Sequence, residues 1–286
     1  MMKSFLQHVL ERWLPQVAKR IRFRAIKKTS LHELLSRRLF EPELALIEPL
    51  LEETTGLCLD VGAHVGEYCY AMERCVDSSR ICAFEPNPET CALLRRFFPK
   101  IHIENVALSD SEGTAKLSIP RSGKKTYATR GTLEHSESGD QMIEVPLTTI
   151  DAFVARISKP LSFLKIDVEG HERKVIAGGK QTMLRDHPVI LIEIEERHSA
   201  QPITETFKEI EALGYKGFFL NLRTWQFSPV ASFDVHAMQN VEMIKSVDYI
   251  NNFLFVPVGN ADLLLTRLRR ALGAPPSGHP SFDKKK

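Results

Sequence analysis

Several features that mark particular classes of protein are missing from this sequence. The 286 residues include five cysteines, Cys58, Cys69, Cys75, Cys82 and Cys91, but no C-x-x-C pair and no histidine cluster at zinc spacing. The odd number of thiols and the apolar neighbours of Cys58 and Cys82 favour buried, reduced cysteines. We therefore expect neither a disulfide framework nor a zinc site, and we expect the cytoplasm as the location.

Long hydrophobic runs and a large net charge are missing as well. The chain lacks the roughly 18 consecutive apolar residues of a membrane span, and Glu11, Arg12, Pro15 and Lys19 interrupt any signal-peptide core. Its 38 basic and 36 acidic residues leave a formal charge of +2, which creates no general attraction to nucleic acid. We expect a soluble protein, peripheral to a membrane at most, with no nucleic-acid partner.

The two ends of the chain differ from its middle. Within a mostly basic segment, residues 1–39, apolar residues recur at every fourth position: Phe5, Val9, Trp13, Val17 and Ile21. Such an amphipathic helical segment either docks on an anionic membrane or a partner protein, or packs on the main domain with its charges solvated. We expect the main domain over residues 40–260, and a C-terminal helix with a proline-rich, disordered tail over 261–286.

From residue 57 onward, short apolar runs alternate with amphipathic stretches, which is typical of an α/β protein with a mostly parallel sheet. Seven runs are candidate strands: Leu57–Val61, Arg80–Glu85, Ile101–Ala107, Ser162–Asp167, Pro188–Glu193, Lys216–Leu220 and Asn252–Val256. We predict one seven-stranded, doubly wound sheet with helices on both faces. Gly113–Ile119 and Met142–Leu147 predict an antiparallel pair around the loop Arg121–Gly139, which is either a lid over the acceptor or disordered.

The first candidate strand leads into a turn suited to a ligand. Asp60 ends the strand, Gly62 can take the φ of a tight turn, and Gly66 lets the next helix approach closely. A dinucleotide fingerprint needs glycine where His64 stands, so an amino-acid-bearing nucleoside fits better than a pyrophosphate. Asp60 is the candidate partner of a methionine ammonium, unless it only caps the turn.

The next two candidate strands end in residues suited to the remainder of such a nucleoside. Glu85 lies at the carboxyl edge of the sheet, where it can accept hydrogen bonds from both ribose hydroxyls, and Asn87 belongs to the same loop. After the third strand, Ser109 or Asp110 can reach the amine of an adenine. A buried strand end followed by a polar turn would show the same pattern.

These motifs resemble those of the FkbM family of methyltransferases. Seven segments occur in the order found in that family: Phe40–Leu44, Leu59–Tyr68, Ala83–Pro88, Asn105–Asp110, Thr149–Phe153, Phe163–Glu172 and Ile192–Glu195. The I-D-V-E-G-x-E motif that begins at Ile166 is the most specific of them. The resemblance implies a Rossmann-like class I methyltransferase fold, S-adenosylmethionine as the donor, and an oxygen acceptor on a sugar or natural product. Family members usually carry Asn at the position of His64, so contacts to the methionine end of the donor differ here.

The fourth candidate strand delivers the candidate catalytic residues Asp167, Glu169 and His171 beside the expected methyl position. A sulfonium donor is already activated, so transfer to oxygen requires in-line approach and removal of the hydroxyl proton. We expect Asp167 to orient the acceptor or donor, and His171, or else Glu169, to act as the base. The same residues alternatively only turn the chain into the next helix.

The fifth candidate strand ends in several acidic residues, but they do not identify a set of metal ligands. Glu193, Glu195 and Glu196, together with Asp167, could bind a magnesium ion that holds a sugar diol. Acids that alternate along a strand also fit a solvated edge without metal. A divalent metal is therefore not expected.

The motifs and the resemblance together predict an enzyme of one-carbon transfer. It would transfer a methyl group from S-adenosylmethionine to a hydroxyl of a small-molecule, saccharide or natural-product acceptor. The alternatives are a catalytically silent methyltransferase-like binding module and an enzyme for a lipid-linked or macromolecular acceptor. The glycine spacing and the absence of a Tyr followed four residues later by Lys disfavour a nicotinamide reductase. No N-P-P-[YF] motif points to methylation of nucleic acid, and no motif names the acceptor.

Overall fold

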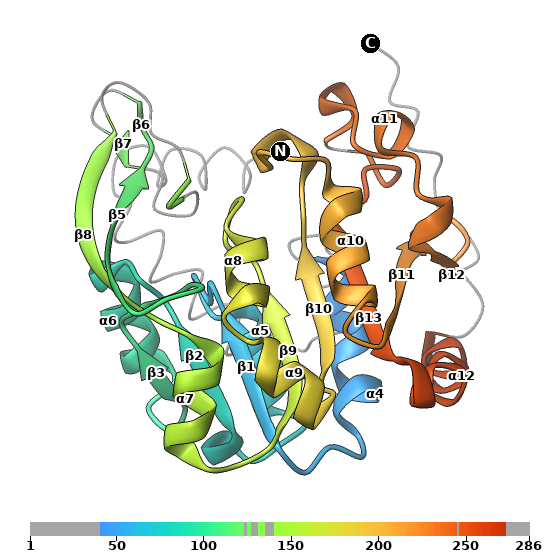
Figure 1. Cartoon of the computed structure of the whole chain (residues 1–286), viewed down its shortest axis with the longest axis horizontal. Coiled ribbons are helices and arrows are strands. Elements are labelled where there is room, and N and C mark those ends of the chain that lie inside the picture. The colour runs from blue at the N-terminus through green and yellow to red at the C-terminus, as the bar shows by residue number, and fades with distance from the viewer. Residues whose placement is uncertain (1–40, 123–124, 127–130, 135–139, 245, 273–286) are drawn as a thin grey trace, which may run out of the picture.

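The centre of the molecule is one eight-stranded sheet (Figure 1). The structure, a computed structural model, describes residues 41–122, 125–126, 131–134, 140–244 and 246–272. The strands of the sheet are β1 (Leu57–Val61), β2 (Ile81–Phe84), β3 (His102–Glu104), β9 (Leu161–Ile166), β10 (Val189–Glu193), β11 (Tyr215–Asn221), β12 (Gln226–Pro229) and β13 (Asn252–Pro257). Their order across the sheet is β12-β11-β13-β10-β9-β1-β2-β3.

Most of this sheet is parallel, as predicted. Strands β3, β2, β1, β9 and β10 pair in parallel, whereas β13 comes last in the chain and lies between β10 and β11, antiparallel to both. The predicted fold class, a Rossmann-like class I methyltransferase sheet, is confirmed.

The predicted number of seven strands is wrong by one. The additional strand, β12, forms an edge hairpin with β11, in which Asn221 lies opposite Gln226 and Phe218 opposite Pro229. Its four residues, Gln-Phe-Ser-Pro, contain no apolar run, because an edge strand is held by backbone hydrogen bonds and buries little.

The third predicted strand, Ile101–Ala107, is also wrong as a single strand. The structure divides it into β3 and β4 (Ala107–Leu108), and β4 belongs to another sheet. Between them, the Asn105 side chain donates hydrogen bonds to the carbonyl oxygens of Glu85 and Pro86, at 2.8 and 2.9 Å. The side-chain amide thus pairs with the neighbouring loop, and the chain leaves the sheet at this point.

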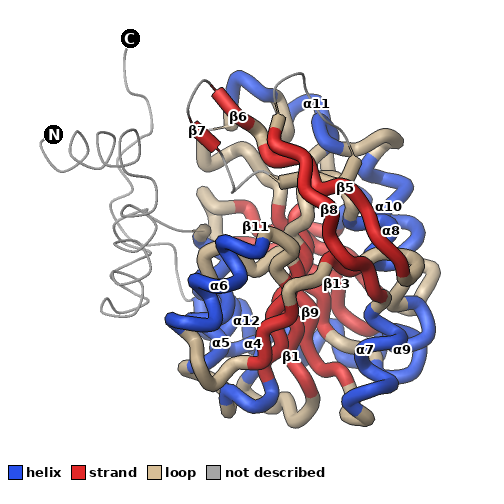
Figure 2. Tube along the Cα trace, turned by 90° about the vertical axis from the view of Figure 1, so that its left-hand side faces the viewer, coloured by secondary structure: helices blue, strands red, loops and turns tan. Residues whose placement is uncertain are grey.

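Helices cover both faces of the sheet, as Figure 2 shows. One face carries α4 (Ile47–Leu51), α5 (Glu67–Glu73), α6 (Pro88–Phe97) and α12 (Ala261–Leu272), and the other carries α7 (Ile150–Ile157), α8 (Glu172–Ala177), α9 (Lys180–Asp186) and α10 (Ile203–Glu211). A separate buried cluster lies on each face, with Cys58 in one, and Leu57, Leu59 and Val61 in the other. Every residue of β1 is buried because helices cover both of its sides.

The predicted antiparallel excursion is confirmed. Strands β5 (Gly113–Ile119) and β8 (Gln141–Thr148) pair antiparallel, and with β4 they form a three-stranded sheet of order β4-β8-β5 at the β3 end of the molecule (Figure 1). Part of the predicted loop forms the short pair β6 (Arg121–Ser122) and β7 (Lys125–Thr126). Thr132 bridges to Ser118.

The described part of the chain ends with α12, which packs on α4 and buries Leu264, Leu265 and Leu268. The predicted N-terminal segment 1–39 and the tail that follows α12 lie outside the described residues, so the proposed segment boundaries stay a prediction. No helix in the described ranges combines the length and apolar character that crossing a bilayer requires.

Candidate active site

A cavity of about 320 Å³ lies at the carboxyl ends of β1, β2, β9 and β10, the edge at which parallel strands present their loops to a ligand. Eight of the predicted site residues line it: Asp60, Gly62, His64, Glu85, Asn87, Asp167, Glu169 and His171. Gly66, Ser109 and Asp110 lie outside its lining. Residues from loops far apart in the sequence thus form one site.

The two glycines of the predicted turn have different surroundings. Gly62 has φ +81°, and a Cβ atom placed on it would lie 1.8 Å from the carbonyl oxygen of Asp167. Gly66 has φ +80°, and its Cβ would lie 2.5 Å from the ring of Phe98, which directly follows α6. Gly62 therefore permits close contact between the β1 and β9 loops, and Gly66 permits the packing of α5 against Phe98.

Glu85 joins the glycine turn to the loop after β2. Its Oε2 accepts a hydrogen bond from the backbone N–H of His64 and its Oε1 from that of Asn87, both at 2.9 Å. His64 has φ 42°, a left-handed conformation that Asn and His adopt more readily than most residues.

Asp60 and Asn87 also make contacts within the protein. The Cys69 thiol donates to Asp60 Oδ2 at 3.2 Å, and burial raises the pKa of Asp60 to about 7. The Asn87 side chain accepts from the backbone N–H of Glu89 at 3.0 Å and so caps α6. The backbone N–H of Cys69, in the first turn of α5, also lowers the pKa of Asp60, so its alternative role as a cap stays open beside the ligand role.

Asp167 directly follows β9 and is half-buried at the cavity. Among the described residues, none donates a hydrogen bond to its carboxylate. Burial raises the pKa of Asp167 to about 6, while the charge of Lys165 acts in the opposite direction. A carboxylate without internal donors is available to a ligand.

His171 is buried and uses both ring nitrogens. Nδ1 lies 2.5 Å from Glu134 Oε1, and Nε2 lies 2.9 Å from Ser109 Oγ. Burial lowers the pKa of the imidazole. A general base role for His171 would therefore require one of these hydrogen bonds to break. Ser109 lies outside the cavity lining, so its predicted contact with an adenine stays a prediction.

Glu169 and Asp110 complete the predicted set. Glu169 has φ 51°, its carboxylate lies 3.2 Å from His198 Nε2, and burial raises the pKa of Glu169 to about 7. Asp110 is exposed and accepts hydrogen bonds from the hydroxyls of Ser109 and Ser111 at 3.2 Å. Next to Glu169, α8 begins at Glu172, whose carboxylate accepts from the Gly170 N–H at 3.0 Å. The segment thus turns into a helix and also lines the cavity.

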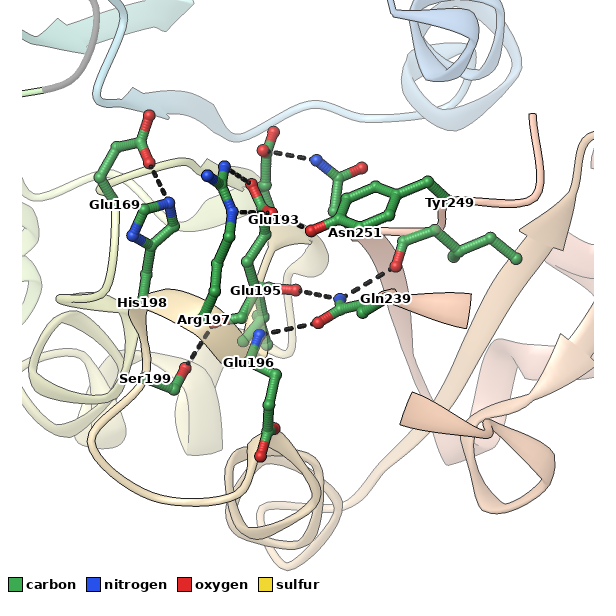
Figure 3. Close-up of polar contacts among 12 residues, drawn as sticks. Glu169, Glu193, Glu195, Glu196, Arg197, His198, Ser199, Gln239, Tyr249 and Asn251 are labelled. Carbon is green, nitrogen blue, oxygen red and sulfur yellow. Dashed lines mark hydrogen bonds and ion pairs between the residues drawn. The ribbon is translucent and has the colours of Figure 1, made fainter. Parts of the chain in front are cut away.

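The acidic residues after β10 lie in a dense network of polar contacts (Figure 3). Arg197 donates to both oxygens of Glu195, at 2.6 and 2.8 Å, and the Tyr249 hydroxyl donates to Glu195 as well. Asn251 donates to Glu193 at 2.6 Å. Glu196 does not belong to the metal-ligand set considered from the sequence. Its carboxylate points away from Glu193 and Glu195 and accepts a hydrogen bond from the Ile203 N–H.

Within the described residues, two other groups of three side chains bring potential ligand atoms within 4.8 Å of one another: Glu41, Asp167 and Glu193, and Glu169, Glu195 and His198. Arg197 binds Glu195 in the second group. The carboxylates of the first group act electrostatically on the buried ammonium of Lys165. Protein cations thus already interact with both groups, and we assign neither of them a metal.

Several residues of the cavity were not predicted. Glu41 and Tyr68 line it from the start of the described chain and from α5, and Gly131 and Leu133 from the loop before β8. Lys165 lines it from the position before the last residue of β9. A lysine inside a mostly apolar strand was the available signal, because lysines are rarely buried without a partner.

Comparisons with known proteins point to one family. The profile of the methyltransferase FkbM domain matches residues 60–220, more than half of the chain. The curated hexuronic acid methyltransferase AglP of Haloferax volcanii is 26% identical over 190 residues, which cover 63% of this chain and 74% of that protein.

Two solved structures are similar at low identity. Methyltransferase FkbM from Methylobacillus flagellatus KT aligns with a TM-score of 0.44 and 13% identity, over 71% of this chain and 43% of that chain. Precorrin-6y C5,15-methyltransferase from Geobacter metallireducens GS-15 aligns with a TM-score of 0.37 and 10% identity, over 76% and 87%. This chain thus spans less than half of the first of these proteins. On the profile match, it belongs to the FkbM family of methyltransferases.

Proposed function

We propose that this chain transfers a methyl group from S-adenosylmethionine to a hydroxyl oxygen of a saccharide or natural-product acceptor. The observation that carries the proposal is the Asp167 carboxylate, which lies in the cavity and receives no hydrogen bond from any described residue. The relative AglP is named for methylation of a hexuronic acid, which supports a saccharide acceptor.

The donor half of the cavity fits the charges and hydroxyls of S-adenosylmethionine. Glu85 would accept from the ribose hydroxyls, because its carboxylate lines the cavity and one backbone N–H orients each of its oxygens. Asp60 would receive the methionine ammonium, and Gly62 would let the backbone come close to the ligand. The donor supplies an activated methyl group when it is bound.

The acceptor half requires a group that orients the hydroxyl and takes its proton. Asp167 fits this role because no residue in the described ranges donates a hydrogen bond to its carboxylate, and because it follows β9 beside the glycine turn. Glu169 is the second candidate for the base. His171 is better suited to holding its neighbours, since Glu134 and Ser109 occupy both of its ring nitrogens.

Calorimetric titration with S-adenosylmethionine and S-adenosylhomocysteine tests the donor assignment, with NAD as the control ligand. We expect micromolar dissociation constants for the two sulfur nucleosides and no heat with NAD, because no glycine-rich pyrophosphate turn is present. Absence of binding by both sulfur nucleosides would contradict the proposed donor and favour a binding module without turnover.

Glu85→Ala should weaken the binding of S-adenosylhomocysteine by about 1–3 kcal/mol, the usual loss for hydrogen bonds to a charged group. The same calorimetric titration measures the effect. Glu89→Ala is the matched control, because Glu89 is exposed on α6 outside the cavity lining and loses the same charge. Equal affinities of the two variants would reject the ribose assignment.

A further inference from the structure

Lys165 is a fully buried lysine in the middle of the sheet. Its residue is 0% exposed, and it lies on β9 two positions before Asp167. Residues two apart on a strand project from the same face. The lysine side chain therefore runs on the face of β9 from which Asp167 continues into the cavity, and both residues line that cavity.

Three elements hold the ammonium of Lys165 in place. Nζ donates to Asn252 Oδ1 of β13 and to the carbonyl oxygen of Ile166, each at 3.3 Å. It also lies 4.9 Å from the centre of the Tyr68 ring of α5, a cation–π distance. The Tyr68 hydroxyl in turn donates to Glu41 Oε2 at 2.6 Å.

The carboxylates around this ammonium come from separate parts of the chain. Oxygens of Glu41, Asp167 and Glu193 lie within 4.8 Å of one another. All three residues are half-buried, and charges of the same sign at that distance repel one another unless a cation compensates them. Among the described residues that line the cavity, Lys165 is the only lysine or arginine.

We propose that Lys165 is a positioning residue, whose ammonium keeps Asp167 a charged carboxylate at the cavity beside Glu41 and Glu193. For methyl transfer this matters through Asp167, which can take the acceptor proton only as a carboxylate; that last step rests on the proposed function. The electrostatic part of the proposal concerns the protein alone and stands without it.

The charges that face Lys165 support this assignment. Burial alone would lower the pKa of the ammonium, but Asp167, Glu41, Glu193 and Asp60 outweigh burial and raise it. For Asp167, burial raises the pKa, Lys165 lowers it, and Glu41 and Glu195 raise it further. Tyr68 stays protonated, because burial and the neighbouring carboxylates raise its pKa well above the ordinary value. The ammonium is thus the charge that opposes protonation of Asp167.

If Lys165 only stabilised the fold, its removal would leave the titration of Asp167 unchanged. Removing one partner of a buried ion pair destabilises a protein whichever role the pair has, because the other charge is left uncompensated. Lys165→Met keeps an unbranched side chain one atom shorter and removes its charge, so the stability of this variant does not by itself distinguish the two roles. The titration of Asp167 distinguishes them, because packing alone does not set it.

The experiment is a pH titration by NMR of protein labelled with ¹³C at aspartate carboxyls, with the Asp167 signal assigned by its loss in Asp167→Asn. We expect the midpoint of Asp167 to rise by about 1–3 pH units in Lys165→Met, the usual effect of losing a nearby opposite charge. Lys165→Arg, which keeps the charge, should restore most of the wild-type midpoint. An unchanged midpoint in folded Lys165→Met would overturn the proposal.

A second measurement uses the wild-type protein and so does not depend on the folding of Lys165→Met. The ¹⁵Nζ signal of Lys165, assigned by its loss in Lys165→Arg, should remain that of an ammonium across neutral pH. A neutral amine at pH 7 would overturn the proposal, because no charge would then compensate the carboxylates. Neither experiment requires methyl transfer, so a protein that binds no S-adenosylhomocysteine would count against the proposed function alone.

Discussion

Asp167→Asn should lower kcat for methyl transfer by about 10²–10⁴-fold, the range for loss of a positioned general base. This corresponds to about 3–5 kcal/mol of transition-state stabilisation. The amide keeps the shape of the side chain, but it cannot accept the hydroxyl proton. Because Asp167 is assigned to the acceptor half, the affinity for S-adenosylhomocysteine should stay within a few-fold of wild type.

The pH dependence of the same reaction checks this role. The folded pKa of Asp167 is raised to about 6 by burial, and the base must be ionised. The rate should therefore fall as the pH decreases through about 6 and level off above it. This acid limb should be missing from the residual activity of Asp167→Asn.

Asp262→Asn is the matched control, because Asp262 is exposed on α12 and does not line the cavity. The steady-state rate of formation of the methylated acceptor measures catalysis, and calorimetric titration measures donor affinity. A large loss of donor affinity in Asp167→Asn would make the residue a donor ligand. If Asp167→Asn kept the full rate of methyl transfer, Glu169 would become the candidate for the general base.

Gly62→Ala should destabilise the folded protein by about 2–5 kcal/mol. Left-handed φ costs a residue with a Cβ atom about 1–2 kcal/mol. The new Cβ would also lie 1.8 Å from the Asp167 carbonyl oxygen, and the backbone shift that relieves such overlap costs about 1–3 kcal/mol more. The shift would move Asp167, so activity should fall together with stability.

Gly214→Ala separates these two contributions. Gly214 also has positive φ, at +92°, but a Cβ atom there meets nothing within 4 Å. Its substitution should cost only the conformational part, about 1–2 kcal/mol. Chemical denaturation of both variants measures the difference, and equal losses would show that contact with the Asp167 backbone is unimportant.

The features that could be predicted from the sequence are those with a local physical cause. Strand β1 is apolar except for Asp60 because both of its faces are buried, and its bounds were predicted as observed. Gly62 was predicted to form a turn because a positive φ favours glycine. Glu85 and Asp167 were expected at one edge because parallel strands end there together, and both line the cavity.

Other features depend on contacts between distant residues, which leave no periodic trace in the sequence. The His171 ring binds Ser109, 62 positions away, and this contact decides that its nitrogens are occupied. Asn105 turns the chain out of the sheet by bonding to carbonyls of a neighbouring loop. Strand β12 forms through backbone pairing at an edge, where side-chain burial contributes little.

The sequence alone thus determined the α/β class, the glycine turn and the acidic residues at the strand ends, since each of these depends on neighbouring residues or on strand polarity. Only the tertiary structure brought Glu41, Asp167 and Glu193 around the ammonium of Lys165. The ionisation of a carboxylate depends on burial and on charges a few ångströms away. Folding decides which charges those are, because they come from β9, β10 and the segment before α4.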